Sequence, residues 1–163
     1  MADEMTKTYI EILVETLRKK VRILEELERH TKHQEELLGE EDFDEALFDE
    51  IIEEKAQLIL EAGDCDDGFE RIYPRVKAEF EQRKYDFQSE IEVLQGLIQK
   101  TMALGASIET LENQNKIRFQ MQITGKRQRI RNYKQSSQVA ASYYKNMANQ
   151  HQMGNSYFMD KKK

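Results

Sequence analysis

The stretch that decides the fold is "YIEILVETLRKKVRILEEL", residues 9–27, in which apolar and charged side chains recur with a helical period. Its apolar residues lie three or four positions apart, so they share one face of an α-helix, while Glu, Lys and Arg occupy the other. That face consists of Ile10, Leu13, Leu17, Val21, Leu24 and Leu27. We therefore predict a helix over about residues 6–38, ending near Gly39 because glycine commonly terminates helices.

A second helical pattern follows a short acidic loop and covers residues 44–62. Asp42 or Asp44 is suited to cap it, because an aspartate side chain accepts a hydrogen bond from the free N–H groups of a first turn. Its apolar face is interrupted at Glu54-Lys55 and otherwise consists of Leu47, Ile51, Leu58 and Ala62. The glycines of "GDCDDG", residues 63–68, predict that this helix ends there.

A third pattern runs over residues 74–124, beginning at Pro74, which suits only a first helical turn. At the rise of an α-helix this segment would be roughly 75 Å long, against roughly 50 Å for the first helix. Its apolar stripe fades toward the end, as expected of an unpaired extension, and nothing in the chain indicates a strand. We therefore expect an all-α fold, in which residues 1–125 form an antiparallel three-helix bundle or coiled-coil hairpin with a projecting third helix.

The charge of the chain is divided unevenly along its length. Residues 1–68 contain 22 acidic and 8 basic residues, whereas residues 113–163 contain 11 basic residues and one acidic residue, Asp160. This division predicts an acidic helical body followed by a basic, mobile tail over residues 126–163. The apolar runs are too short to span a membrane, and the first residues do not resemble a secretory signal. A single cysteine cannot form an intramolecular disulfide, which favours the cytoplasm.

Candidate metal ligands in this sequence are weak. His30 and His33 lie three positions apart and, with a nearby carboxylate, are able to share zinc, but a solvated helix end is the preferred interpretation. A calcium loop beginning at Asp64 fails, because Phe69 occupies the position that requires glycine. We predict no metal and no cofactor.

Catalytic signals are equally weak. Cys65 lies between Asp64 and Asp66, whose negative charges disfavour the reactive thiolate. The chain contains no glycine-rich phosphate loop or nucleophile elbow. We therefore predict that the protein is not an enzyme.

The basic C-terminal region contains two segments of interest. The bases of "KRQRIRNYK", residues 126–134, are able to contact phosphates, to meet an acidic protein surface, or simply to remain solvated. The segment "VAASYYKNM", residues 139–147, is amphipathic, and it is suited to fold against a partner, to pack on the bundle, or to stay disordered. Tyr and Met are favoured at adaptable interfaces. The predicted partner-binding residues are Ile117, Met121, Ile130, Val139, Tyr143, Tyr144, Met147, Tyr157 and Phe158.

Residues 37–62, "LLGEEDFDEALFDEIIEEKAQLILEA", resemble the helix-loop-helix core of FlgN-type flagellar export chaperones. The polar Asn113-Gln114-Asn115 run and the overall length are also similar, and the resemblance extends over about residues 5–125. FliT-type chaperones are alike at this level. The matching positions are Leu37-Leu38, Asp42, Leu47, Ile51, Glu54-Lys55 and Leu58.

This resemblance implies a cytoplasmic helical chaperone without ATPase activity. Such chaperones bind hook–filament junction proteins, prevent their premature association and deliver them to the flagellar type III export apparatus, and they hold the cargo with their C-terminal helical region. We expect a protein that does not insert into membranes and that is a monomer or weak dimer, because the apolar runs are short and the third helix lacks strict heptads. Two other functions remain open from the residues alone: binding of nucleic acid through residues 126–134, and self-association as a structural coiled coil.

Overall fold

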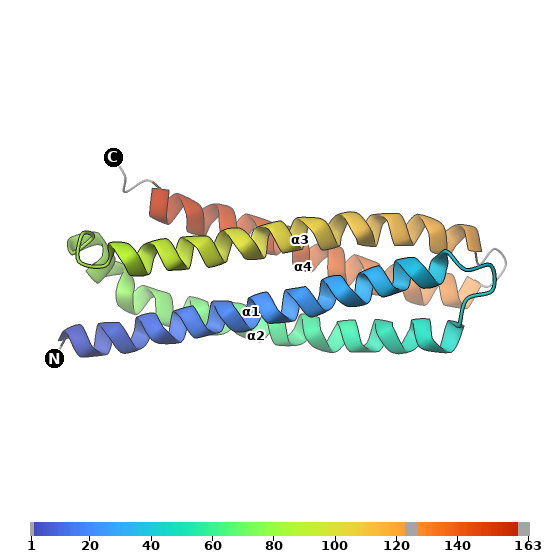
Figure 1. The fold of residues 1–163 in the computed structure, drawn as a ribbon, viewed down its shortest axis with the longest axis horizontal. Coiled ribbons are helices and arrows are strands. Elements are labelled where there is room, and N and C mark those ends of the chain that lie inside the picture. The colour runs from blue at the N-terminus through green and yellow to red at the C-terminus, as the bar shows by residue number, and fades with distance from the viewer. Residues whose placement is uncertain (1, 123–126, 160–163) are drawn as a thin grey trace.

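The computed structural model describes residues 2–122 and 127–159, with side-chain surroundings for residues 4–122 and 133–149. The helices run alternately in opposite directions along one long axis (Figure 1). The all-α prediction is confirmed, but the arrangement differs from three helices and a tail, because most of the expected tail forms a fourth helix. The elements are α1 (Ala2–Leu38), α2 (Glu45–Gln82), α3 (Gln88–Gln122) and α4 (Arg127–Met159).

The four helices are not packed equally closely. Helix α1 packs along both α2 and α3, and α4 packs along α3, whereas α4 meets α2 over a much shorter stretch. In Figure 1 helix α4 lies behind α3 and leaves the chain end on the same side as the N-terminus. The seam between α2 and α4 is therefore the least closed side of the bundle.

Helix α1 forms as its periodicity predicts. The structure buries all six residues of the predicted apolar face. The helix ends at Leu38, where the backbone N–H of Gly39 donates to the carbonyls of Glu35 and Glu36 at 3.2 and 3.1 Å. The first helix is thus confirmed, and it begins a few residues earlier than expected.

Helix α2 is twice as long as predicted. It begins as expected, with the carboxylate of Asp44 accepting a hydrogen bond from the Leu47 N–H at 3.0 Å. It then continues through Gly63 and Gly68, because a regular stripe of buried side chains carries it onward to Gln82. The members of that stripe are Ala62, Cys65, Val76 and Phe80. The predicted break at residues 63–68 is wrong, since tertiary burial outweighs the low helix propensity of two glycines.

Pro74 lies inside α2 and does not start the third helix. Its side chain is exposed, and the last part of α2 leaves the line of the rest of the helix (Figure 1), as is common where a proline removes a backbone hydrogen bond. The real boundary lies at residues 83–87, where the Arg83 guanidinium donates to Asp86 at 3.1 Å. Phe87 turns inward against Phe80, with ring centroids 5.7 Å apart. Helix α3 therefore begins at Gln88 and does not project as a single 51-residue rod.

The core consists of three clusters along the bundle axis. The first cluster joins the start of α1, the end of α2 and the start of α3, around Leu13, Phe80 and Leu94. The middle cluster includes Leu24, Ala62 and Ile108 together with three residues of α4: Ala140, Tyr144 and Met147. The distal cluster lies near the α1–α2 loop and contains Phe43, Phe48, Phe119 and Tyr133. Helix α4 therefore completes two of the three clusters.

Candidate functional site

Helix α4 is fixed to the bundle by a methionine and aromatic side chains. Met147 is 2% exposed, and its terminal methyl group lies where a Cβ on Gly105 of α3 would be, so a larger residue at position 105 would force the Met147 side chain to shift. Tyr144 is also buried. At the distal end Tyr133 stacks on Phe119 with a centroid separation of 4.3 Å. Tyr144 and Met147, which were predicted to bind a partner, fill the core of the bundle, so of the three alternatives for residues 139–147 the structure shows packing on the bundle.

A polar cluster, which we call the clasp, also holds α4. It consists of Tyr143, Asp66 and Lys20. The Tyr143 hydroxyl donates to one carboxylate oxygen of Asp66 at 3.2 Å, and Lys20 Nζ donates to the other at 2.5 Å. This arrangement joins α1, α2 and α4 through one carboxylate. Burial raises the pKa of Tyr143, and the charge of Asp66 raises it further. The clasp thus keeps the phenol protonated while it fixes the position of α4 relative to α2.

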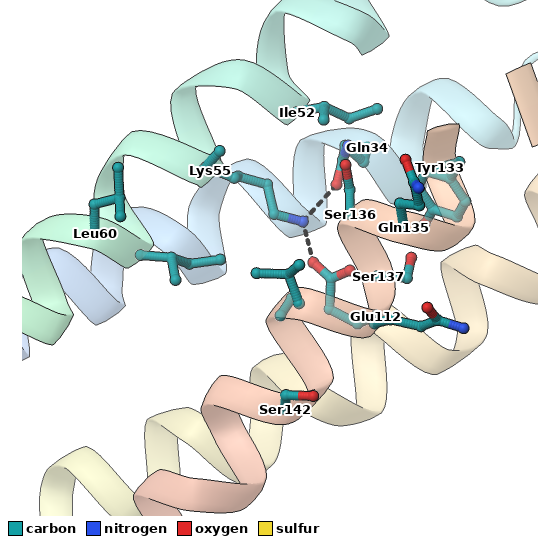
Figure 2. A pocket seen from close by; sticks show the side chains of 15 residues that line it. Gln34, Ile52, Lys55, Leu60, Glu112, Tyr133, Gln135, Ser136, Ser137 and Ser142 are labelled. Carbon is teal, nitrogen blue, oxygen red and sulfur yellow. Dashed lines mark hydrogen bonds and ion pairs between the residues drawn. The ribbon is translucent and has the colours of Figure 1, made fainter. Parts of the chain in front are cut away.

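A groove of about 760 Å³ opens between α2 and α4. Figure 2 shows the two helices on opposite sides of the space, with α1 and α3 behind it. Its walls are largely apolar on the α2 side, and α4 contributes small polar side chains and Val139. Leu60 on α2 is 65% exposed and Val139 on α4 is 62% exposed, so each wall presents an apolar side chain to solvent. The groove is thus formed where the seam of the bundle is least closed.

The floor of the groove is a buried polar network. Lys55 Nζ donates to Gln34 Oε1 at 2.7 Å and to the Glu112 carboxylate (Figure 2). The Thr31 hydroxyl also donates to Glu112, at 3.3 Å. Lys55 and Glu112 are each 6% exposed. Burial lowers the pKa of Lys55, and the charge of Glu112 opposes this effect. The floor therefore holds a compensated pair of opposite charges contributed by α2 and α3.

Only one of the two polar atoms of the Gln34 amide takes part in this network. Its side chain is fully buried, its carbonyl accepts from Lys55, and its Nε2 has no hydrogen-bond partner within the part of the chain that the structure describes. Asn115 is similar, because its amide donates to the Thr31 carbonyl at 3.0 Å while its Oδ1 lacks a partner there. Buried polar groups are normally paired, and in the described part of the chain the donor of Gln34 is one of several unpaired buried polar atoms at the groove, together with the hydroxyls of Tyr133 and Ser137.

Of the predicted partner-binding residues, some are exposed in the structure and others are buried. Val139 lines the groove. Ile117 and Met121 are 60% and 74% exposed, one helical turn apart on α3, and neither lines the groove. Tyr143 is half-buried against the middle cluster. The side chains of Ile130, Tyr157 and Phe158 lie outside the described residues.

Several groove residues escaped the sequence analysis. Ile52, Ile59 and Leu60 lie off the single apolar face expected for the second helix, yet they form its groove wall. The signal was the "LIL" run at residues 58–60, which places apolar side chains on two faces of one helix. The sequence indicates the polar floor less clearly, because Lys55 is recognisable there only as an interruption of the apolar face of the second helix.

The candidate metal and thiol residues are held in ordinary packing. His30 Nε2 lies 3.3 Å from a carboxylate oxygen of Glu54, and burial lowers the pKa of the imidazole. Among the described residues no group of three or more His, Cys, Asp or Glu is placed to hold a metal ion. Burial raises the pKa of Cys65; the charges of Lys19 and Lys20 oppose this effect, and those of Asp66 and Asp64 add to it. No helix of the described part is long and apolar enough to cross a membrane.

The fold and the groove together define an elongated antiparallel four-helix bundle with one open seam. Bundles of this class bind their ligands between helices. Comparisons of the chain with protein-family models, curated proteins and solved structures return no match. The resemblance to FlgN-type chaperones therefore stays a prediction from the sequence.

Proposed function

We propose that this protein is a chaperone-type binding protein that holds a helical segment of a partner protein in the groove between α2 and α4. The observation that carries this proposal is the pair of exposed apolar side chains, Leu60 and Val139, on opposite walls of one groove. An amphipathic helix that lays its apolar face into such a groove is a recurring mode of recognition.

The magnitude of the proposed contact is adequate for a reversible chaperone. Covering the exposed fractions of Leu60 and Val139 contributes about 1–2 kcal/mol each, and the half-buried Ile52 and Ile59 add less. Association and the ordering of the partner segment subtract from this sum. These contacts sum to less than the roughly 8 kcal/mol of a micromolar complex, so we expect micromolar or weaker binding, and a competing contact is sufficient to release the partner without ATP hydrolysis.

The sequence resemblance supplies the identity of the proposed partner. We propose that the bound helix belongs to a hook–filament junction subunit, which the protein keeps from associating prematurely and delivers to the flagellar type III export apparatus. A junction subunit that assembles through helical termini has apolar helix faces that need cover before assembly, and the groove offers such cover.

The test is co-purification of a hook–filament junction subunit with groove variants. Leu60→Glu and Val139→Glu place a charge in the groove, and both positions are exposed, so stability should change by less than about 0.5 kcal/mol. Each substitution should weaken binding about tenfold or more. Met5→Glu is the matched control, because Met5 is 59% exposed and does not line the groove.

A second pair of substitutions shows whether the partner binds at the groove or at the other exposed apolar positions. Ile117→Glu and Met121→Glu change the outer face of α3. If these two variants lose the junction subunit while the Leu60 and Val139 variants keep it, the partner binds α3 and the groove proposal is refuted.

A further inference from the structure

The unpaired amide of Gln34 indicates what kind of helix the groove accepts. Gln34 is fully buried and lines the groove, and its Nε2 has no partner among the described residues. A buried donor without an acceptor is costly, whereas a ligand that supplies the acceptor removes that cost. We infer that the groove selects an amphipathic helix bearing one asparagine or glutamine in the middle of its apolar face, whose side-chain carbonyl accepts from Gln34 Nε2. This inference rests on the proposed function.

The charges of the floor favour an amide over a carboxylate. Lys55 is already paired with Glu112, so the floor carries a compensated pair of charges. A carboxylate from the partner would lie near Glu112 without a cation of its own, and such buried charges are strongly disfavoured. An amide brings an acceptor for Gln34 without adding charge. A wholly apolar helix would leave the Nε2 donor without an acceptor, as it is within the described part of the free chain.

The walls set where the amide lies along the bound helix. Ile52 and Leu60 are eight residues apart on α2, about 12 Å along its axis, and Lys55 lies between them. The amide of the partner should therefore be flanked, about one turn away on each side, by apolar residues that contact these two wall positions. The middle of the apolar face, and not its ends, faces Gln34.

The rim of the groove adds a preference for charge. Glu53 and Asp64 are exposed on α2, two turns before and one turn after Leu60, so helical spacing places them on the same face of α2 as Leu60, outside the groove lining itself. The exposed residues of the α4 wall, Gln135, Gln138, Val139 and Ser142, are uncharged. The flank of the bound helix that faces α2 should thus carry Lys or Arg, which steers its orientation.

The inference is testable with synthetic helices. The probes are two cross-linked helical peptides of about 20 residues, with leucines on one face, lysines on one flank, and either Gln or Leu at the central apolar position. Their dissociation constants are measured by fluorescence polarisation with the full chain and with Gln34→Met, which keeps the side-chain length and removes the donor. Gln135→Met is the matched control, because Gln135 also lines the groove but is exposed.

The full chain should bind the Gln peptide about five- to tenfold more tightly than the Leu peptide, and Gln34→Met should abolish or reverse that preference. Gln135→Met should leave it unchanged. Thermal melts show whether Gln34→Met is folded, and Gln34→Leu serves as a second variant if it is not. Equal binding of both peptides, or a preference for Leu, overturns the inference and leaves the groove proposal intact. Failure of both peptides to bind overturns the inference, whereas the groove proposal itself fails only if the groove variants retain the junction subunit.

Discussion

The buried pair of Lys55 and Glu112 offers the sharpest test of the structure. Replacing Lys55 with methionine keeps most of the side-chain volume but removes the ammonium group. The Glu112 carboxylate is then left in a site that is 6% exposed, with the Thr31 hydroxyl as its remaining hydrogen-bond donor. Removing one partner of a buried ion pair typically costs about 3–5 kcal/mol, because the other charge is left uncompensated. We expect a loss of this size for Lys55→Met.

A double-mutant cycle isolates the interaction between the two charges. Glu112→Leu alone leaves the ammonium of Lys55 with only the Gln34 carbonyl and should also destabilise the protein. The double variant Lys55→Met, Glu112→Leu contains no buried charge, so it should recover most of the loss and equal or exceed the stability of the original chain. The expected coupling energy is about 3 kcal/mol.

Urea unfolding near neutral pH, followed by far-ultraviolet circular dichroism, measures the four stabilities of the cycle. Lys32→Met is the control, because Lys32 lies 3.5 Å from Glu28 in an ion pair whose lysine is largely exposed. Such pairs are worth less than about 1 kcal/mol. If Lys55→Met is as mild as Lys32→Met, or if the two substitutions are simply additive, the network at the groove floor does not exist as described.

Three further predictions concern the attachment of α4. Burial raises the pKa of Tyr133, Tyr143 and Tyr144, so the folded protein keeps protons that the unfolded chain releases above about pH 10. The stability from these groups is complete below that pH and falls as the pH rises through it. Urea midpoints should therefore drop between about pH 9 and pH 11, and the part of the tyrosinate absorbance that comes from these three residues should appear only on unfolding. Asp66→Asn replaces the anion shared by α1 and α4 with a neutral amide and should lower the unfolding free energy by about 1–3 kcal/mol in thermal melts; no change would mean that the clasp is not formed. Phe119→Ala removes the ring stacked between α2 and α4 and should cost about 3–5 kcal/mol by the same measurement; a cost below about 1 kcal/mol would contradict the distal cluster.

Periodicity was sufficient to predict α1 but not the extent of α2. In α1 every apolar position follows one stripe, so pattern and packing agree. In α2 the local signals at Gly63, Gly68 and Pro74 oppose the long-range signal. Two glycines cost about 1 kcal/mol each and an interior proline about 3 kcal/mol. Full burial of Val76 and Phe80 offsets part of this cost, and the benefit depends on helices far away in the sequence.

The buried face of α4 could not be chosen from the sequence. Val139, Tyr143, Tyr144 and Met147 were all predicted to bind a partner, whereas the structure buries Tyr144 and Met147 together with Ala140 and leaves Val139 exposed. Val139 and Tyr143 are spaced by one helical turn, as are Ala140 and Tyr144, so periodicity alone does not separate the two faces. A polar, basic segment can thus be a core helix when its few apolar side chains are all used.

The groove floor could not be predicted, because its residues come from separate helices. Gln34, Lys55 and Glu112 meet only when α1, α2 and α3 take one register, and nothing in their local sequence encodes that register. A well-packed apolar floor would often be at least as stable as this network. In the proposed function, the amide donor that this network leaves unpaired at the groove provides discrimination among bound helices at some expense in stability. If the protein holds one helix and releases it intact, as we propose, discrimination is the more useful property.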